Sequence, residues 1–194
     1  MSQDQIDTRT KVLEASKKLF AKNGFSATSI REIAIASGVN SAAVSYHFGG
    51  KENLLIAIFE ACFPKPPHLT ANSGTNYLAE LDRLIRAIIG LRFSDPDLVN
   101  LMQQEIILKT ARTQILAAFL SPFWEAIAEN LSRGREAGVY DFDDLGNAVK
   151  FVMSVLSYPR HDLTLEFLKG AFEQAEPEDL IEENVRLILK ALCA

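Results

Sequence analysis

Residues 28–48 read TSIREIAIASGVNSAAVSYHF and contain two short helical patterns separated by a turn. Ser29 can cap the first helix, with a glutamate at the capping-box distance of three residues. Ser37-Gly38-Val39 then interrupts the pattern, because glycine permits a sharp change of direction and Val39 can fill the core between the helices. Asn40 is a good N-cap for a second helix over about residues 41–47. The stretch therefore predicts a helix-turn-helix.

The segments on either side of this stretch also read as helices. Apolar residues recur at helical spacing from about Thr8 to Asn23, and Gly24 can close that helix in the left-handed conformation of a C-cap. A further helix starts near Lys51 and ends before Pro64. We therefore expect a compact helical head over residues 1–60.

The remaining residues, 61–194, predict a helical body. Apolar residues recur at helical spacing and no alternating strand pattern occurs, so the whole chain is expected to be all-α, with about nine to ten helices. Asp95-Pro96 is a good helix start. Pro122 lies in an apolar stretch and predicts a break near Ser121. The expected helices cover about residues 77–93, 96–109, 121–137, 143–157, 163–174 and 178–192.

The net charge of −5 is divided unevenly along the chain. Residues 1–60 carry seven Lys or Arg and six Asp or Glu, a net charge of +1, whereas the remainder carries 13 basic and 19 acidic residues, a net charge of −6. Contact with phosphates needs a local positive face and not a basic protein, so this division permits DNA binding by the head. It disfavours non-specific, charge-driven coating of DNA.

Several other classes of function have little support. Cys62 and Cys193 are too few for a disulfide framework, so reduced thiols are expected, with a redox-sensing pair as the alternative. No metal site, cofactor or enzyme is expected, because the three histidines are dispersed and no phosphate loop or nucleophile elbow occurs. Neither a signal peptide nor a membrane-spanning run is present, which predicts a cytoplasmic protein without a membrane partner.

The second helix of the motif has the composition of a DNA-reading helix. Its outer surface carries the small side chains of Ser41, Ala42, Ala43 and Ser45, which let the backbone approach base edges in the major groove. Tyr46, His47 and Lys51 follow as donors for phosphate oxygens.

Residues 8–59 resemble the tetracycline-repressor (TetR) family of bacterial transcription regulators. The resemblance rests on a dense set of motifs: Ala15, Leu19, Phe20, Asn23-Gly24-Phe25, Thr28-Ser29-Ile30-Arg31-Glu32-Ile33-Ala34, Ser37-Gly38-Val39, Tyr46-His47-Phe48 and Lys51-Glu52-Asn53-Leu54. It covers nearly a third of the chain. The remaining residues diverge too far to match by motif.

The resemblance implies a homodimer whose two heads enter successive major grooves of a palindromic double-stranded DNA operator. Thr28 would touch phosphate, Arg31 a base or phosphate, and Lys51 a phosphate at a helix N-terminus. Ser45 departs from the family, which often has a bulky aromatic residue there, so no base preference is carried over. The predicted DNA-binding residues are Thr28, Arg31, Asn40, Ser41, Ala42, Ala43, Ser45, Tyr46, His47 and Lys51.

The resemblance also implies that the body forms the dimer and encloses an effector pocket. The segments 145–156 and 180–192 are amphipathic, as a four-helix dimer interface requires, although they could instead pack within one monomer. Aromatic and methionine residues are the pocket candidates, though most such residues serve as core. The predicted ligand-binding residues are Phe93, Met102, Phe119, Phe123, Trp124, Phe151 and Tyr158.

The sequence thus predicts a ligand-responsive dimeric transcriptional repressor that a small-molecule effector of unknown identity releases from its operator. Such an effector would act by binding the DNA-incompetent dimer more tightly. The alternative is a helical protein-interaction module that does not bind DNA.

Overall fold

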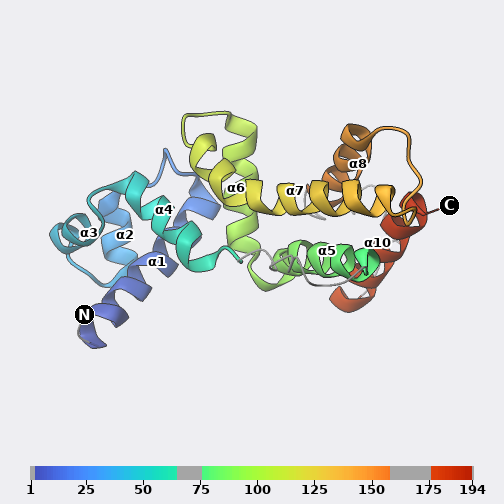
Figure 1. Ribbon diagram of the computed structural model, residues 1–194. Coiled ribbons are helices and arrows are strands. Elements are labelled where there is room, and N and C mark those ends of the chain that lie inside the picture. The colour runs from blue at the N-terminus through green and yellow to red at the C-terminus, as the bar shows by residue number, and fades with distance from the viewer. Residues whose placement is uncertain (1–2, 65–75, 158–175, 194) are drawn as a thin grey trace, which may run out of the picture. The chain divides into compact units, whose positions relative to one another are not determined.

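The computed structural model describes residues 3–64, 76–157 and 176–193, with side chains from residue 7 onward. Within these ranges the regular structure consists of nine α-helices and no strand, which confirms the all-α prediction (Figure 1). The predicted helix over residues 163–174 lies outside the described residues. The helices are α1 (Gln3–Asn23), α2 (Ile30–Ser37), α3 (Ser41–Phe48), α4 (Lys51–Cys62), α5 (Tyr77–Ser94), α6 (Pro96–Leu108), α7 (Thr113–Glu136), α8 (Leu145–Ser157) and α10 (Pro177–Leu192).

The chain divides into two compact units. Unit 1 consists of Met1–Pro64 and Asp95–Phe119, and unit 2 of Lys65–Ser94 and Leu120–Ala194. Helix α6 therefore packs with α1 to α4, and α7 contributes its first turns to unit 1 and the rest to unit 2. The sequence places the end of the head close to the first of these boundaries, but it contains no signal that α6 belongs with the head.

The core of unit 1 is built on the apolar stripe of α1. Val12, Ser16 and Phe20 are buried, and the Ser16 hydroxyl donates to the Val12 carbonyl oxygen at 2.6 Å. Gly24 ends the helix with a φ of +85°, and its N–H donates to the Phe20 carbonyl. The Phe25 ring then folds back against the Phe20 ring, with 5.1 Å between centroids. The predicted C-cap is confirmed, whereas α1 begins at Gln3 and not near Thr8.

Helix α6 is held against α1 by polar contacts at both of its ends. The Lys17 ammonium pairs with Asp95, the N-cap of α6, at 2.5 Å, and both side chains are largely buried. Nearer the other end, the Gln104 amide donates to the Ala21 carbonyl at 2.7 Å. These contacts join the last two turns of α1 to α6, so unit 1 is larger than a minimal helix-turn-helix head.

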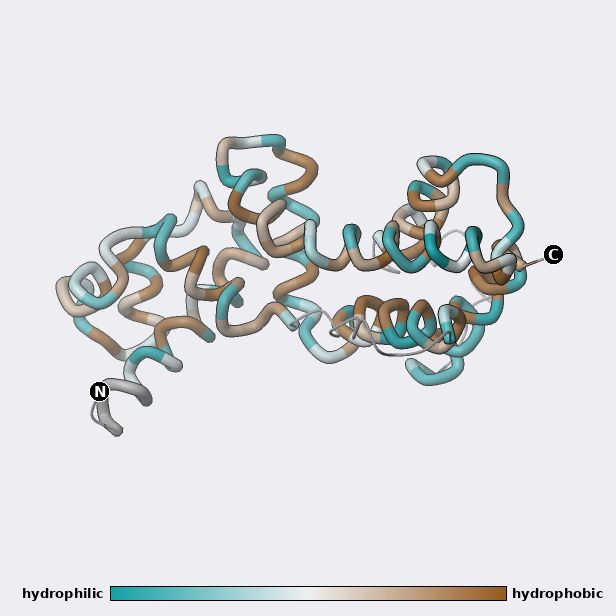
Figure 2. The backbone as a smooth tube through the Cα atoms, in the orientation of Figure 1, coloured by the Kyte–Doolittle hydropathy of each residue, from teal (hydrophilic) through white to brown (hydrophobic). Residues whose placement is uncertain are grey.

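The core of unit 2 is formed by α5, the second part of α7, α8 and α10. Apolar residues recur along α5 at helical spacing (Figure 2), and Leu81, Leu84 and Ile85 are fully buried. A polar cluster lies within this core. The Tyr140 hydroxyl donates to Asn130 Oδ1 at 2.8 Å, and Asn130 Nδ2 donates to the buried Glu80 carboxylate at 3.2 Å.

The predicted break near Ser121 is wrong, because α7 continues through Pro122 as one helix. A proline inside a helix removes one backbone hydrogen bond and costs about 3 kcal/mol. The apolar pattern nevertheless continues on both sides of it, with Leu116 buried before the proline and Phe123 and Ile127 buried after it. Burial of these side chains at helical spacing offsets the cost, since each contributes roughly 1.5–3 kcal/mol.

Candidate nucleic-acid interface

Helix α2 supports the candidate interface and begins with a complete capping box. The Glu32 N–H donates to the Ser29 hydroxyl at 3.2 Å, and the Ser29 N–H donates to the Glu32 carboxylate at 2.7 Å. The hydrogen bonds from Ser29 lower the pKa of Glu32 below its ordinary value. Ile33 and Ala34 point into the core. Gly38 ends the helix with a φ of +68°, a conformation that favours glycine, so the predicted turn is confirmed.

Helix α3 is anchored by its apolar side and exposes the other. Asn40 caps it by accepting from the Ala42 N–H at 2.8 Å, as predicted, and Gly49 ends it with a φ of +70°. Val44 and Phe48 are buried, which fixes the rotation of the helix about its axis. The residues on the outer side are Ser41, Ala42, Ser45, Tyr46 and His47, all exposed, with Ala43 half-buried.

Tyr46 is the most exposed large side chain of this surface, at 86%. Its ring meets the His47 ring edge-on, with 5.5 Å between centroids and 74° between planes. An exposed aromatic pair at the end of a helix offers a phenol and an imidazole to an external partner while the helix itself stays anchored. Arg31 is likewise exposed on α2.

The structure does not support the predicted phosphate contact of the Thr28 hydroxyl. Thr28 is 1% exposed, and its hydroxyl lies 2.9 Å from the Gly24 carbonyl and 3.3 Å from the Leu19 carbonyl, to which it donates. The side chain therefore ties the loop before α2 to the end of α1. Burial of position 28 depends on the packing of that loop, which the sequence motif does not reveal.

Lys51, predicted as a phosphate donor, also holds this loop in place. Its ammonium donates to the Thr28 carbonyl at 2.7 Å and to the Ser26 carbonyl at 3.4 Å, and lies 4.5 Å from the centroid of the Phe25 ring. Burial, together with the nearby Arg112 cation, lowers the pKa of Lys51. Any phosphate contact by this ammonium thus comes in addition to its structural role.

Two cations near the interface were not predicted. The Arg9 guanidinium lies over the Phe48 ring of α3, 4.9 Å from its centroid, and Arg112 lies over the Phe25 ring at 4.2 Å. Arg112 also pairs at 3.0 Å with Glu105, whose side chain is 1% exposed. Helical spacing places Arg9 beside the core stripe of α1, so its position near the head could have been predicted from the sequence. No local pattern connects Arg112 with the Phe25 ring, which precedes it by 87 positions.

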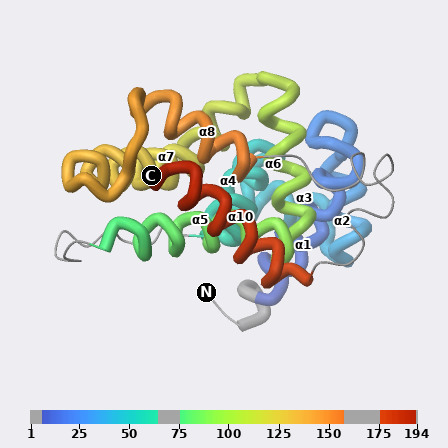
Figure 3. Tube along the Cα trace, turned by 90° about the vertical axis from the view of Figure 1, so that its right-hand side faces the viewer, coloured from blue at the N-terminus to red at the C-terminus, as the bar shows by residue number. Residues whose placement is uncertain are grey.

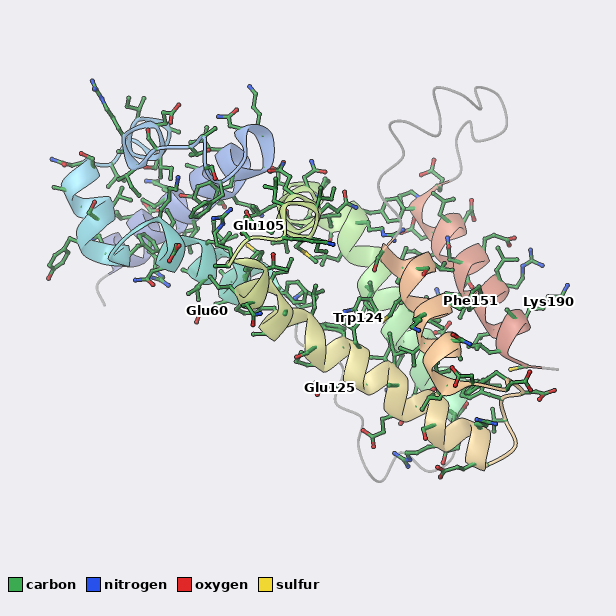
Figure 4. All side chains as sticks on the ribbon, turned by 90° about the horizontal axis from the view of Figure 1, so that it is seen from above. Glu60, Glu105, Trp124, Glu125, Phe151 and Lys190 are labelled. Atoms are coloured by element: carbon green, nitrogen blue, oxygen red, sulfur yellow. The ribbon has the colours of Figure 1, made fainter. Side chains whose placement is uncertain are left out.

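The predicted ligand-binding residues do not form one described cluster. Met102 and Phe119 belong to unit 1, where the Phe119 ring packs against Phe59 at 5.5 Å. Phe123 is buried in unit 2, and Phe93 and Trp124 pack against its core. Phe151 is 42% exposed on the surface of α8 (Figure 4) and so does not line the interior. Tyr158 lies outside the described residues.

Among the described residues, no group of three or more His, Cys, Asp or Glu side chains is placed to hold a metal ion. In that part of the chain, no helix combines the length and the apolar character that crossing a membrane requires.

The arrangement of α2, the left-handed turn at Gly38 and the outward-facing α3 defines a helix-turn-helix, a class in which the second helix enters the major groove of DNA. Residues 12–58 match the family model described as bacterial regulatory proteins, tetR family. This match covers the helix-turn-helix and the helices on either side of it, so this part of the chain is similar to the DNA-binding part of TetR-family regulators.

Individual relatives and a solved structure match this chain over longer stretches. The probable HTH-type transcriptional regulator YttP of Bacillus subtilis is 30% identical over 122 residues, which cover 60% of this chain and 59% of that protein. The repressor KstR2 of Rhodococcus jostii is 28% identical over 74% of each chain. The crystal structure of HlyIIR, a hemolysin II transcriptional regulator, matches with a TM-score of 0.77 and 26% identity over 100% of this chain and 99% of that one.

Proposed function

We propose that this chain is a dimeric transcriptional repressor that binds a palindromic DNA operator through α3 and leaves it when a small-molecule effector binds the body. The observation that carries DNA binding is the two-sided character of α3. Its inner residues Val44 and Phe48 are buried, while the small side chains and the Tyr46–His47 pair face outward. A helix of this kind can approach base edges closely without loss of core packing.

The proposed contacts divide into two groups. Ser41, Ala42, Ala43 and Ser45 lie on the part of α3 that would face bases, with Asn40 at its N-terminus. Tyr46, His47, Arg31 and Lys51 would position the helix by contacts with phosphates, and Arg9, beside α3, is added to this group. Contacts with phosphates make affinity fall steeply with salt, whereas contacts with bases set the preference for sequence.

The proposed dimer uses α8 and α10. Each of these helices buries one side in unit 2, with Val152 and Ile188 fully buried, and each exposes a large apolar residue, Phe151 at 42% and Leu187 at 51%. Apolar side chains exposed on neighbouring amphipathic helices are typical of an interface between subunits. Phe151 is therefore proposed as a residue of the dimer interface, whereas the sequence predicted it in the effector pocket.

The repressor assignment and its effector are supported chiefly by similarity. AcnR of Corynebacterium glutamicum, KstR2 of Rhodococcus jostii and NicS of Pseudomonas putida are named repressors. For the effector, the remaining candidates in unit 2 are Phe93, Phe123 and Trp124. An effector that binds there would release DNA only if it bound the DNA-incompetent state more tightly.

The test combines selection with point variants. Duplexes bound by the protein are selected from random DNA, and the expected result is a sequence with two related half-sites about one helical turn apart. Tyr46→Ala should then weaken operator binding at least about tenfold, since hydrogen bonds to charged groups contribute roughly 1.5–3 kcal/mol. Ile107→Ala is the matched control, because it removes a similarly exposed side chain (77%) from α6. Release of DNA is then measured with a panel of metabolites.

Two outcomes contradict the proposal. If no sequence is enriched, a helical interaction module without DNA binding becomes the better interpretation. If the half-sites are not related by two-fold symmetry, the dimeric arrangement fails even though the chain binds DNA.

A further inference from the structure

Helix α3 lacks the side chains that distinguish guanine, adenine and cytosine by their hydrogen bonds. In the major groove, Arg or Lys recognises guanine, Asn or Gln recognises adenine, and Asp or Glu recognises cytosine. None of these residue types occurs in α3, whose sequence is SAAVSYHF. The hydroxyl groups of Ser41 and Ser45 can bond to more than one base and so discriminate little. A preference for particular bases therefore has to come from another kind of contact.

Asn40, which precedes α3, does not supply the missing recognition. Contact of an asparagine with adenine uses both ends of the amide, since the oxygen accepts from N6 and the nitrogen donates to N7. The Asn40 Oδ1 instead accepts from the Ala42 N–H at 2.8 Å and caps the helix. The cap directs this oxygen towards the backbone of α3, so only the amide nitrogen is available to a base.

The Ala42 methyl group points outward from the first turn of α3. The helix turns by about 100° per residue, which places Ala42 on the side opposite Val44 and Phe48. Those two side chains are buried, whereas Ala42 is exposed and Ala43 half-buried. Figure 3 shows α3 beside α2 in unit 1, and both α2 and α4 contact it. The outer side of this anchored helix thus presents an apolar group where it would enter a groove.

Thymine is the base whose major-groove edge complements a methyl group. Its C5-methyl is the apolar group on that edge, and an alanine side chain can pack against it. Cytosine carries only a hydrogen atom at the same carbon. Guanine and adenine offer donors and acceptors that a methyl group would leave without partners, which is unfavourable.

We propose that the Ala42 methyl group packs against the C5-methyl of a thymine in each operator half-site, with Ala43 beside it, and that this contact sets the base preference of α3. The inference rests on the proposed function, DNA binding through α3, and specifies which base is recognised and by which atoms. It also accounts for the small side chains around Ala42, since a larger residue would hold the helix away from the base edge.

The test first removes the methyl group from the DNA. The operator is found by selection from random duplexes, and each thymine is then replaced by deoxyuridine, which keeps the base pair and lacks only the C5-methyl. At one position in each half-site this change should weaken binding about fourfold, and about 15-fold when both half-sites are changed, as expected for loss of one buried methyl group each. At the same position, 5-methylcytosine should bind more tightly than cytosine by a similar factor.

The methyl group is then removed from the protein. With Ala42→Gly, the thymine and deoxyuridine operators should bind equally well. Ala79→Gly is the matched control, because Ala79 is also exposed in the first turn of its helix, α5, and its N–H also donates to an asparagine side chain, that of Asn76, at 3.1 Å. It lies in unit 2 and should keep the fourfold effect of deoxyuridine. Fluorescence anisotropy of labelled duplexes measures the dissociation constants, and circular dichroism verifies that both variants are folded.

The outcomes separate this inference from the proposed function. If selection enriches no sequence, DNA binding fails and the inference with it. If an operator is found but no deoxyuridine replacement weakens binding, DNA binding stands and recognition of a thymine methyl group is refuted. A loss with deoxyuridine that is equally large for Ala42→Gly also refutes the inference, because Ala42 then does not contact that methyl group.

Discussion

Gly134 on α7 lies against the ring of Tyr140, so a single added methyl group should destabilise unit 2. A Cβ atom built at Gly134 would overlap the Tyr140 ring, and the atoms concerned belong to the ring and not to a flexible chain end. The Gly134 carbonyl also accepts from the Val139 N–H at 2.8 Å. The turn after α7 therefore holds Tyr140 close to this glycine.

The expected loss follows from what the displaced ring gives up. Overpacking of a core costs about 1–3 kcal/mol. Displacement of Tyr140 also removes the donor to Asn130 Oδ1, and a buried acceptor without a donor costs about 1–3 kcal/mol. Against this, alanine is more favourable than glycine inside a helix by about 1 kcal/mol. The net effect expected for Gly134→Ala is a loss of about 3 kcal/mol in the free energy of unfolding of unit 2.

Gly90 provides a matched control within the same unit. It lies inside α5, and a Cβ atom built there meets nothing within 4 Å. Gly90→Ala should therefore stabilise unit 2 by about 0.5–1 kcal/mol. Trp124 is the single tryptophan of the chain and packs against the core of unit 2, so its fluorescence in a urea titration reports the unfolding of that unit.

The two variants are expected to change stability in opposite directions. If Gly134→Ala is as stable as Gly90→Ala, the packing of the ring on α7 is not as described. A second variant, Tyr140→Leu, makes the comparison sharper: combined with Gly134→Ala it should lose less stability than the two single changes added together, because the overlap is already removed.

Three further predictions concern unit 1. Arg112→Ala leaves the buried Glu105 carboxylate without its ion-pair partner and should lower the free energy of unfolding by about 3–5 kcal/mol, measured by circular dichroism in urea. Replacing both residues by apolar ones should recover most of this loss. Equal stability of the single and double variants would contradict the prediction. Lys51→Ala should lower stability by roughly 1–2 kcal/mol without DNA, because its ammonium holds two carbonyls, and a loss of DNA affinity alone would contradict that role. Hydrogen bonds from Ser29 lower the pKa of Glu32, so its ionised form stabilises α2 above the ordinary pKa and the effect is lost as pH falls through the lowered value. The stability difference between the original chain and Glu32→Ala should accordingly shrink in acid, and a constant difference would exclude the capping box as its cause.

The prediction of α2 and α3 from the sequence succeeded because their ends are set by local chemistry. Ser29 and Asn40 cap the N–H groups of their own helices, and Gly38 adopts a conformation that other residues rarely reach. The buried and exposed sides of α3 follow from the spacing of Val44 and Phe48. Such features involve neighbours within four residues, so one sequence is enough to identify them.

The sequence was misleading or silent where distant contacts decide the outcome. Pro122 has a strong local preference to end a helix, but burial on both sides of it keeps α7 continuous. The fold also buries the Thr28 hydroxyl, which was predicted to contact phosphate, and it gives Lys51 a structural role that the sequence does not reveal.

What the sequence determined by itself is thus the position of the helix-turn-helix, its caps and the outward-facing surface of α3. Only the tertiary structure revealed that α6 belongs to unit 1, that Arg112 lies over Phe25, and that Phe151 is exposed on α8. The physical reason is the distance along the chain between the residues that are in contact. Caps and helical periodicity involve adjacent turns, whereas the side that a side chain faces depends on which distant helix covers it.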